Sequence, residues 1–145
     1  MSIYNQVVWG TKTILTSAVR TATQTILGQD ILDPLDSSGK RSGINAEISG
    51  AVFYLNITSV PGVDTVQLVL DEQDPTSGVW SQVAAVTATA ATGMVKMKIK
   101  PAITAVAASA TGVVVQDVLP AIWRLRVVHS AGTNFTYSLG AALYC

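Results

Sequence analysis

Residues 51–71 (AVFYLNITSVPGVDTVQLVLD) constrain the fold more than any other stretch of the chain. Apolar residues alternate with more polar ones from Phe53 to Ile57, and the alternation resumes from Val66 to Leu70. A period of two buries one face of a strand and leaves the other face wetter. The Pro-Gly pair between the two runs favours a turn. We therefore predict a long β-hairpin here.

The same pattern returns later in the chain. After the turn-forming residues 74–78 (DPTSG), residues 79–83 are predicted to run back along the strand that contains Leu68. Residues 122–129 and 135–139 alternate as well, and the loop between them predicts a second hairpin. Short strands at spacings of roughly ten residues are typical of an antiparallel sandwich or barrel. We predict an all-β fold, an antiparallel β-sandwich or barrel-like body with an extended N-terminal arm.

The alternation also predicts which side chains form the core of this body. The expected buried residues are the apolar members of the best-patterned strands, namely Phe53, Leu55, Ile57, Leu68, Trp123, Leu125, Val127 and Leu139. Trp80 and Trp123 are interpreted as core or subunit-interface anchors.

Residues 1–44 differ from the rest of the chain and are predicted to be an arm and loop, followed by a single β body over residues 45–145. Residues 11–27 are rich in Thr and Ser and are interpreted as two short strands or extended segments. Residues 28–43, which carry several turn signals, are interpreted as a loop. An extended segment can add a strand to a neighbouring subunit, and Trp and Tyr are frequent interface anchors. The predicted partner-contacting or capsid-contacting residues of the arm are Ile3, Tyr4, Val7, Val8 and Trp9.

Charge and hydropathy exclude several classes of protein. Nine basic and nine acidic residues cancel, so net charge provides no case for nucleic acid or an anionic membrane as a partner. The sequence contains no run of about 18 uninterrupted apolar residues, so we predict no transmembrane helix. Charged residues make up 12% of the chain, against about 25% in an average protein. This low charge, with an apolar fraction of 49%, has two interpretations: a soluble β domain that happens to carry little charge, or a domain whose apolar surface is largely covered by other chains. Cys145 is the only cysteine, so an intrachain disulfide is impossible.

Candidate catalytic residues are few. His129 is the only histidine, and no nucleophile-elbow sequence accompanies it, so we interpret it as a strand-end residue with ordinary hydrogen bonds. No second histidine or further cysteine exists to build a zinc site. We therefore predict no catalytic residues, no enzymatic activity, no metal and no cofactor.

Three charged groups have an alternative interpretation as binding sites. The acidic cluster of Asp71, Glu72 and Asp74 could hold Ca²⁺ or supply a pair of carboxylates, but a solvated hairpin end explains it better, because the spacing does not match an EF-hand loop. Asp30, Asp33 and Asp36 recur every third residue, which suits turn-forming side chains better than metal ligands.

Three lysines, Lys96, Lys98 and Lys100, alternate with Val95, Met97 and Ile99 in the most regular one-sided strand of the chain. They could follow a row of phosphates, but no aromatic residue lies between them in that strand. A solvated strand face is the preferred interpretation. Lysines in this pattern also discourage edge-to-edge pairing.

Four segments together resemble a known family. They are residues 17–23 (SAVRTAT), 74–80 (DPTSGVW), 117–129 (DVLPAIWRLRVVH) and 136–141 (TYSLGA). In this order they resemble small β-rich virion proteins of tailed bacteriophages, and among these the head decoration, or cement, proteins. The resemblance covers the chain from about residue 17 to its end.

The resemblance implies a homotrimer on the outer surface of the capsid head that holds neighbouring subunits of the major capsid protein together. We therefore expect a non-enzymatic virion protein that stabilises a capsid. Two alternatives stay open: another virion position, such as the tail tube or the baseplate, and a β-sandwich module that binds carbohydrate. The carbohydrate alternative predicts exposed aromatic residues clustered on one loop or face.

Overall fold

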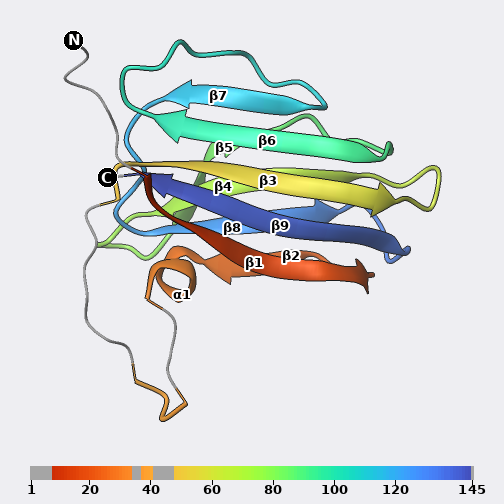
Figure 1. The fold of residues 1–145 in the computed structure, drawn as a ribbon, viewed down its shortest axis with the longest axis horizontal. Helices are drawn as coiled ribbons and strands as arrows, with labels where there is room; N and C mark the ends of the chain where they lie inside the picture. The colour runs from red at the N-terminus through yellow and green to blue at the C-terminus, as the bar shows by residue number, and fades with distance from the viewer. Residues whose placement is uncertain (1–7, 34–36, 41–47, 145) are drawn as a thin grey trace.

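The computed structural model of the protein describes residues 8–33, 37–40 and 48–144, and its side chains from Gly10 onward. These residues form two β-sheets that pack face to face (Figure 1), so the predicted all-β sandwich is confirmed. The five-stranded sheet contains, in spatial order, β1 (Val8–Arg20), β9 (Phe135–Tyr144), β3 (Gly50–Ser59), β6 (Gly93–Lys100) and β7 (Gly112–Gln116). The four-stranded sheet contains β2 (Gln24–Leu27), β8 (Trp123–His129), β4 (Val66–Gln73) and β5 (Trp80–Ala85).

Both predicted long hairpins are wrong in their pairing. The strands β3 and β4 have the predicted alternation, but β3 lies in the five-stranded sheet and β4 in the four-stranded sheet. Likewise β8 and β9 belong to opposite sheets. Each predicted turn is a crossing between sheets, and each strand finds its partners elsewhere: β3 pairs with β6 and β9, and β4 pairs with β5 and β8. The predicted return of residues 79–83 along β4 is confirmed by the antiparallel β4–β5 pair.

One pair of neighbouring strands is parallel. The strands β6 and β7 run in the same direction because residues 101–111 carry the chain back along the edge of the sheet before β7 begins. Within this connection Val106 forms a bridge with Val114, so part of the outer edge of β7 is already paired.

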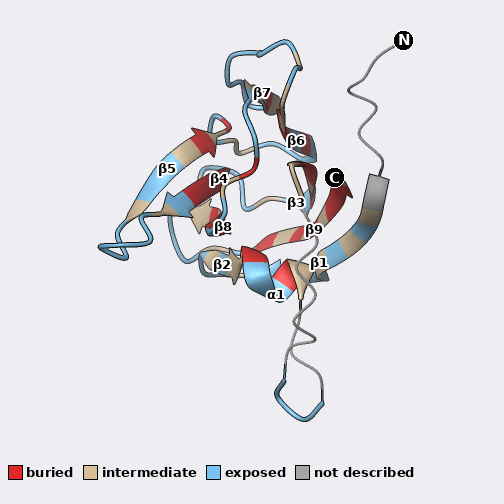
Figure 2. Cartoon of the chain, turned by 90° about the vertical axis from the view of Figure 1, so that its left-hand side faces the viewer, coloured by how far each residue is buried: buried red, intermediate tan, exposed pale blue. Residues whose placement is uncertain are grey.

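The first part of the chain belongs largely to the sandwich. We expected residues 1–44 to be an arm and loop, but β1 pairs with β9 and β2 pairs with β8. A short helix, α1 (Gly28–Leu32), which the sequence analysis placed in a loop, follows β2. The view along the strands shows α1 at the side of the sandwich where β1 and β2 lie (Figure 2). The β body therefore starts at Val8, and not at residue 45.

Helix α1 approaches the core closely because its first residue is glycine. A Cβ atom on Gly28 would lie 2.5 Å from Cε2 of Trp123, which is closer than any real Cβ contact. The ring of Trp123 also packs on Phe53 of the opposite sheet, with ring centres 5.4 Å apart. Ile31 of α1 is buried in the same core. Gly28 thus allows α1 to cover the indole without displacing it.

The predicted core is confirmed residue by residue, since none of its eight members is more than 3% exposed. These side chains point inward from both sheets, so the apolar faces that the alternation predicted meet in one cluster. Asp71 is the exception among buried residues, because it lies on the outer face of its sheet and is polar.

Replacing Leu55 or Leu125 with Ala is expected to lower the free energy of unfolding by about 2–5 kcal/mol, because each leaves a cavity between the sheets. Both leucines are 1% exposed or less. Urea denaturation measures the loss, with Val63→Ala as the control, because Val63 is 88% exposed. A loss at Leu55 and Leu125 no larger than at Val63 would contradict this core.

Candidate functional site

The best-organised polar cluster in the described chain lies on the outer face of the four-stranded sheet. Strand pairing places Asp71 of β4 opposite Arg124 of β8, and Val69 opposite Arg126. Because side chains alternate along a strand, Asp71 and both arginines project from the same outer face, while Trp123, Leu125 and Val127 project into the core.

Asp71 is held by both guanidinium groups. Arg126 donates from Nε to Oδ2 at 2.6 Å and from Nη2 to Oδ1 at 3.1 Å, and Arg124 donates from Nε to Oδ2 at 2.8 Å. The carboxylate is 2% exposed, whereas the arginine side chains remain 24% and 29% exposed. We had interpreted Asp71 as part of a solvated hairpin end, and that interpretation is wrong for this residue. Glu72 and Asp74 are exposed as expected.

The two ion pairs determine the charge of the cluster. Burial alone would raise the pKa of Asp71, but the hydrogen bonds from Arg126 and Arg124 outweigh it and hold the pKa below its usual value. The bond to Asp71 also raises the pKa of Arg126. One carboxylate therefore faces two guanidinium groups, and the cluster has a net charge of +1 at neutral pH. A carboxylate so strongly bound is a poor general base.

An aromatic ring extends this cluster toward one end of the sheet. The guanidinium carbon of Arg124 lies 4.4 Å from the centre of the Trp80 ring. Trp80 pairs with Gln73, and the carbonyl of Ile122 accepts a hydrogen bond from the Gln73 backbone at 3.0 Å. Trp80 of β5, Gln73 of β4 and Ile122, which directly precedes β8, thus form a row, with Ile122 42% exposed.

Exposed apolar side chains adjoin this row. Val79 precedes Trp80 and is 63% exposed, and Val118, in the segment that leads into β8, is also exposed. We call Trp80, Arg124, Ile122, Val79 and Val118 the tryptophan end of the sandwich. Figure 2 looks onto this end and shows exposed segments in β5 and in the turn before it. Trp and Arg side chains are enriched among the residues that anchor protein interfaces, and the exposed aliphatic side chains beside them add apolar surface.

The predicted arm residues fall at the same end, to the extent that the structure describes them. Ile3, Tyr4 and Val7 lie outside the described residues. Val8 and Trp9 begin β1, where Val8 pairs with Tyr144. Tyr144 also pairs with Gly50 at the start of β3, and the neighbouring Ser49 accepts a hydrogen bond from Leu119 on the segment that leads to Ile122. Cys145 and Asp36 lie outside the described residues.

His129 lies at the opposite end and is part of a packed structural cluster. Its Nε2 is 2.8 Å from the hydroxyl of Tyr137, and its ring meets Phe135 edge to face at 5.2 Å. Arg20 covers the Tyr137 ring at 5.0 Å and donates from Nη1 to the Tyr137 carbonyl. The backbone amide of His129 donates to Thr23 Oγ1, so its interpretation as a hydrogen-bonded strand-end residue is confirmed.

Burial moves the pKa values in this cluster away from neutrality. Burial and the nearby Arg20 charge lower the pKa of His129, while burial raises the pKa of Tyr137 to about 12. Both side chains are therefore neutral at pH 7. This favours a role in packing over one in proton transfer.

Known proteins add no further information about this chain, because no protein-family model matches the sequence and a search of the curated proteins finds no match. Among the described residues, no group of three or more His, Cys, Asp or Glu side chains is placed to hold a metal ion. No helix in the described part of the chain is long and apolar enough to cross a membrane. Function must therefore be inferred from the β-sandwich and its surfaces.

Sequence reasoning missed the cluster around Asp71. The signal was present, since Asp71 follows an alternating run and Arg124 and Arg126 share one strand face. This pattern could not predict the Asp71–arginine contacts, because the hairpin prediction paired β4 with β3 and not with β8.

Asp71→Asn is expected to lower the free energy of unfolding by about 1–3 kcal/mol, because two partly buried guanidinium groups lose their anionic acceptor. Glu72→Gln removes the same charge from the adjacent, exposed position and should change stability by less than about 0.5 kcal/mol. Chemical denaturation of the two variants provides the comparison. Equal effects at both positions would show that Asp71 does not hold the arginines in solution.

Stability is also expected to depend on the protonation of His129. Because the folded state lowers the pKa of His129, its contribution is fully present above the ordinary value near 6.5 and is lost as the pH falls toward and through the folded value. Unfolding free energies measured from about pH 7 down to about pH 5 should fall more steeply for the wild type than for His129→Gln. His129 is the only histidine, so identical slopes would refute the burial of a neutral imidazole.

Proposed function

We propose that this protein is a non-enzymatic structural component of a tailed-phage virion that decorates and stabilises the outside of the capsid, as a homotrimer that bridges capsid subunits. The observation that carries the proposal is the tryptophan end, where the Arg124 guanidinium lies over Trp80 and the nearby segments expose Ile122, Val79 and Val118. Such an end is suited to burial against another chain, and a clamp of this kind requires no reaction chemistry.

The resemblance to decoration proteins supports the same function. Two of its segments supply parts of the tryptophan end: residues 74–80 form the turn that ends in Trp80, and residues 117–129 lead through Ile122 into β8. The other two segments lie in β9 and at the junction of β1 and β2. The family-like residues thus include those that hold the exposed apolar side chains in place.

The predicted contact residues Ile3, Tyr4, Val7, Val8 and Trp9 fit this proposal. The chain enters β1 at Val8, whose partner Tyr144 is linked through Gly50 and Ser49 to the segment that contains Ile122. A segment that precedes Val8 would leave the body near the tryptophan end. We propose that it contributes to the same contact with the capsid.

Carbohydrate binding is the weaker alternative. A sugar-binding face needs open aromatic rings, and Trp80 has the guanidinium of Arg124 over its ring. Tyr54 and Tyr144 of the other sheet are likewise approached by lysine side chains.

We expect the wild-type protein to co-sediment with empty capsids of its own phage and to sediment alone as a trimer. Ile122→Asp should weaken capsid binding by at least about tenfold, because it places a charge in a desolvated contact. Removal of residues 2–7, which leaves all of β1, should also weaken binding while the melting temperature stays unchanged. Co-sedimentation and analytical ultracentrifugation measure both properties.

Val63→Asp is the matched control, because Val63 is 88% exposed in the crossing between β3 and β4, away from the tryptophan end. It should bind capsids like the wild type. The proposal fails if the wild-type protein does not bind capsids or sediments as a monomer. It also fails if Ile122→Asp binds as tightly as Val63→Asp.

A further inference from the structure

The chain has no net charge, yet its charges are separated in space. The five strands of the five-stranded sheet contain Lys12, Arg20, Lys96, Lys98 and Lys100, and their sequences contain no Asp or Glu. More than half of the nine basic residues therefore belong to strands without any acidic residue. The chain has equal numbers of basic and acidic residues, yet the strands of this sheet carry only positively charged side chains.

Three of these basic residues form a row on the outer face. Val95, Met97 and Ile99 of β6 are buried, so the alternating Lys96, Lys98 and Lys100 project outward. Adjacent lysines are two residues apart, which is about 7 Å along a strand.

Tyrosine rings from β3 and β9 lie beside two of these three lysines. Tyr54 of β3 is paired with Lys96, whose Nζ lies 6.0 Å from the centre of the Tyr54 ring. Nζ of Lys100 lies 3.6 Å from the centre of the Tyr144 ring on β9. The three lysines and two tyrosines together are the lysine face. The sequence analysis found no aromatic residue within the lysine strand, but the sheet brings in two from other strands.

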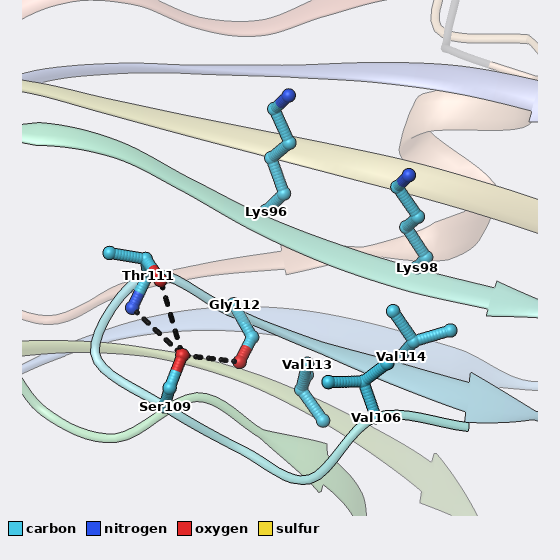
Figure 3. Close-up of a pocket in the computed structure, with 8 residues that line it drawn as sticks. All are labelled: Lys96, Lys98, Val106, Ser109, Thr111, Gly112, Val113 and Val114. Atoms are coloured by element: carbon cyan, nitrogen blue, oxygen red, sulfur yellow. Dashed lines mark hydrogen bonds between the residues drawn. The ribbon is translucent and has the colours of Figure 1, made fainter. Parts of the chain in front are cut away.

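A shallow hollow of about 180 Å³ adjoins the lysine face. Lys96 and Lys98 form one wall, and Val106, Ser109 and Val114 contribute to the other. Figure 3 shows both lysine side chains rising on the same side of β6, away from Ser109. Val106 is 56% exposed, so the hollow offers apolar contact beside the row of ammonium groups.

We propose that the lysine face binds an acidic segment of a partner protein, with carboxylates on Lys96, Lys98 and Lys100 and an apolar side chain in the hollow beside Val106. This is a second contact surface, because it belongs to the five-stranded sheet, whereas Trp80 and Arg124 belong to the four-stranded sheet. The inference goes beyond the proposed function, since it assigns the chemistry of a separate partner.

Charge complementarity favours an acidic protein over nucleic acid. The row of lysines spans only about 13 Å, which matches two or three carboxylates spaced along an extended chain. The ring of Tyr144 already has an ammonium group over it and is poorly available for base stacking. The chain as a whole is neutral, so it lacks the long-range attraction that supplies most non-specific nucleic-acid affinity.

Asp117 is the one acidic residue that follows β7. The structure records no ion pair between its carboxylate and the three lysines of the row. Asp117 is linked to Lys100 through the backbone, since its amide donates to the Lys100 carbonyl at 3.1 Å. Its carboxylate accepts a hydrogen bond from the amide of Val118 at 2.8 Å.

Binding of a fluorescent glutamate homopeptide to the full-length protein tests the proposal without any capsid. We expect saturable binding at low ionic strength that weakens as salt is added. The triple variant Lys96→Gln, Lys98→Gln, Lys100→Gln should lose at least about tenfold in affinity. Lys98→Gln alone should lose more than Lys40→Gln, which removes one positive charge outside the five-stranded sheet. Thermal unfolding establishes that each variant is folded.

Three results would overturn the proposal. The first is a wild-type protein that does not bind the glutamate peptide, or a folded triple variant that binds it equally well. The second is tighter binding of a thymidine oligonucleotide of equal charge, which would assign the face to nucleic acid. The third is wild-type self-association that the triple variant abolishes, which would assign the face to a second copy of this chain. A failure of capsid binding alone would refute the proposed function and leave this inference standing.

Discussion

The sandwich depends on two chain crossings that lie side by side and hold one another. One crossing carries the chain from β3 to β4, and the other carries it from β8 to β9. Thr133 Oγ1 donates to Asp64 Oδ2 at 2.7 Å, and Thr65 and Ser130 exchange two further hydrogen bonds at 2.8 and 2.9 Å. Because both crossings move the chain from one sheet to the other, four strands with inward apolar faces are brought to opposite sides of one core.

This arrangement explains why both outer faces carry charge. Each sheet turns its apolar face toward the core, so polar residues of the alternating strands project outward. On the four-stranded sheet the outward charges meet as Asp71 between Arg124 and Arg126, a cluster fixed by hydrogen bonds from two neighbouring strands. On the five-stranded sheet the outward charges include Lys96, Lys98 and Lys100, and tyrosine rings lie beside the first and the last of these. The first cluster thus keeps one net positive charge beside its bound carboxylate, whereas the lysine face carries three ammonium groups on strands without an acidic residue.

The two ends of the sandwich also differ. At one end, burial keeps His129 and Tyr137 uncharged and Arg20 donates to the Tyr137 carbonyl, while Val19 and Val63 remain exposed in the adjoining segments. At the other end, apolar side chains remain exposed around Trp80. The two ends thus differ in their polar groups, with a buried neutral His129–Tyr137 pair at one end and the Trp80–Arg124 cation–π pair at the other.

The sequence by itself determined the all-β class, the eight predicted core residues and the outward direction of the three lysines. These follow from local alternation, because the period of two decides which side of a strand each residue occupies. Sequence also located the β4–β5 turn, whose residues specify it locally. The sequence did not predict the cluster around Asp71 or the tyrosines beside the lysines.

Only the tertiary structure decided which strands are neighbours. A Pro-Gly pair or a short polar loop permits either a hairpin or a crossing between sheets. Local chemistry therefore could not show that β3 and β4, or β8 and β9, belong to opposite sheets. Helix α1 likewise depends on Gly28 meeting Trp123, a contact between residues far apart in sequence. The candidate surfaces are built from such long-range pairings, such as Asp71 with Arg124 and Lys100 with Tyr144. Their existence is therefore a property of the packed sandwich, because only packing brings together side chains that the chain itself keeps apart.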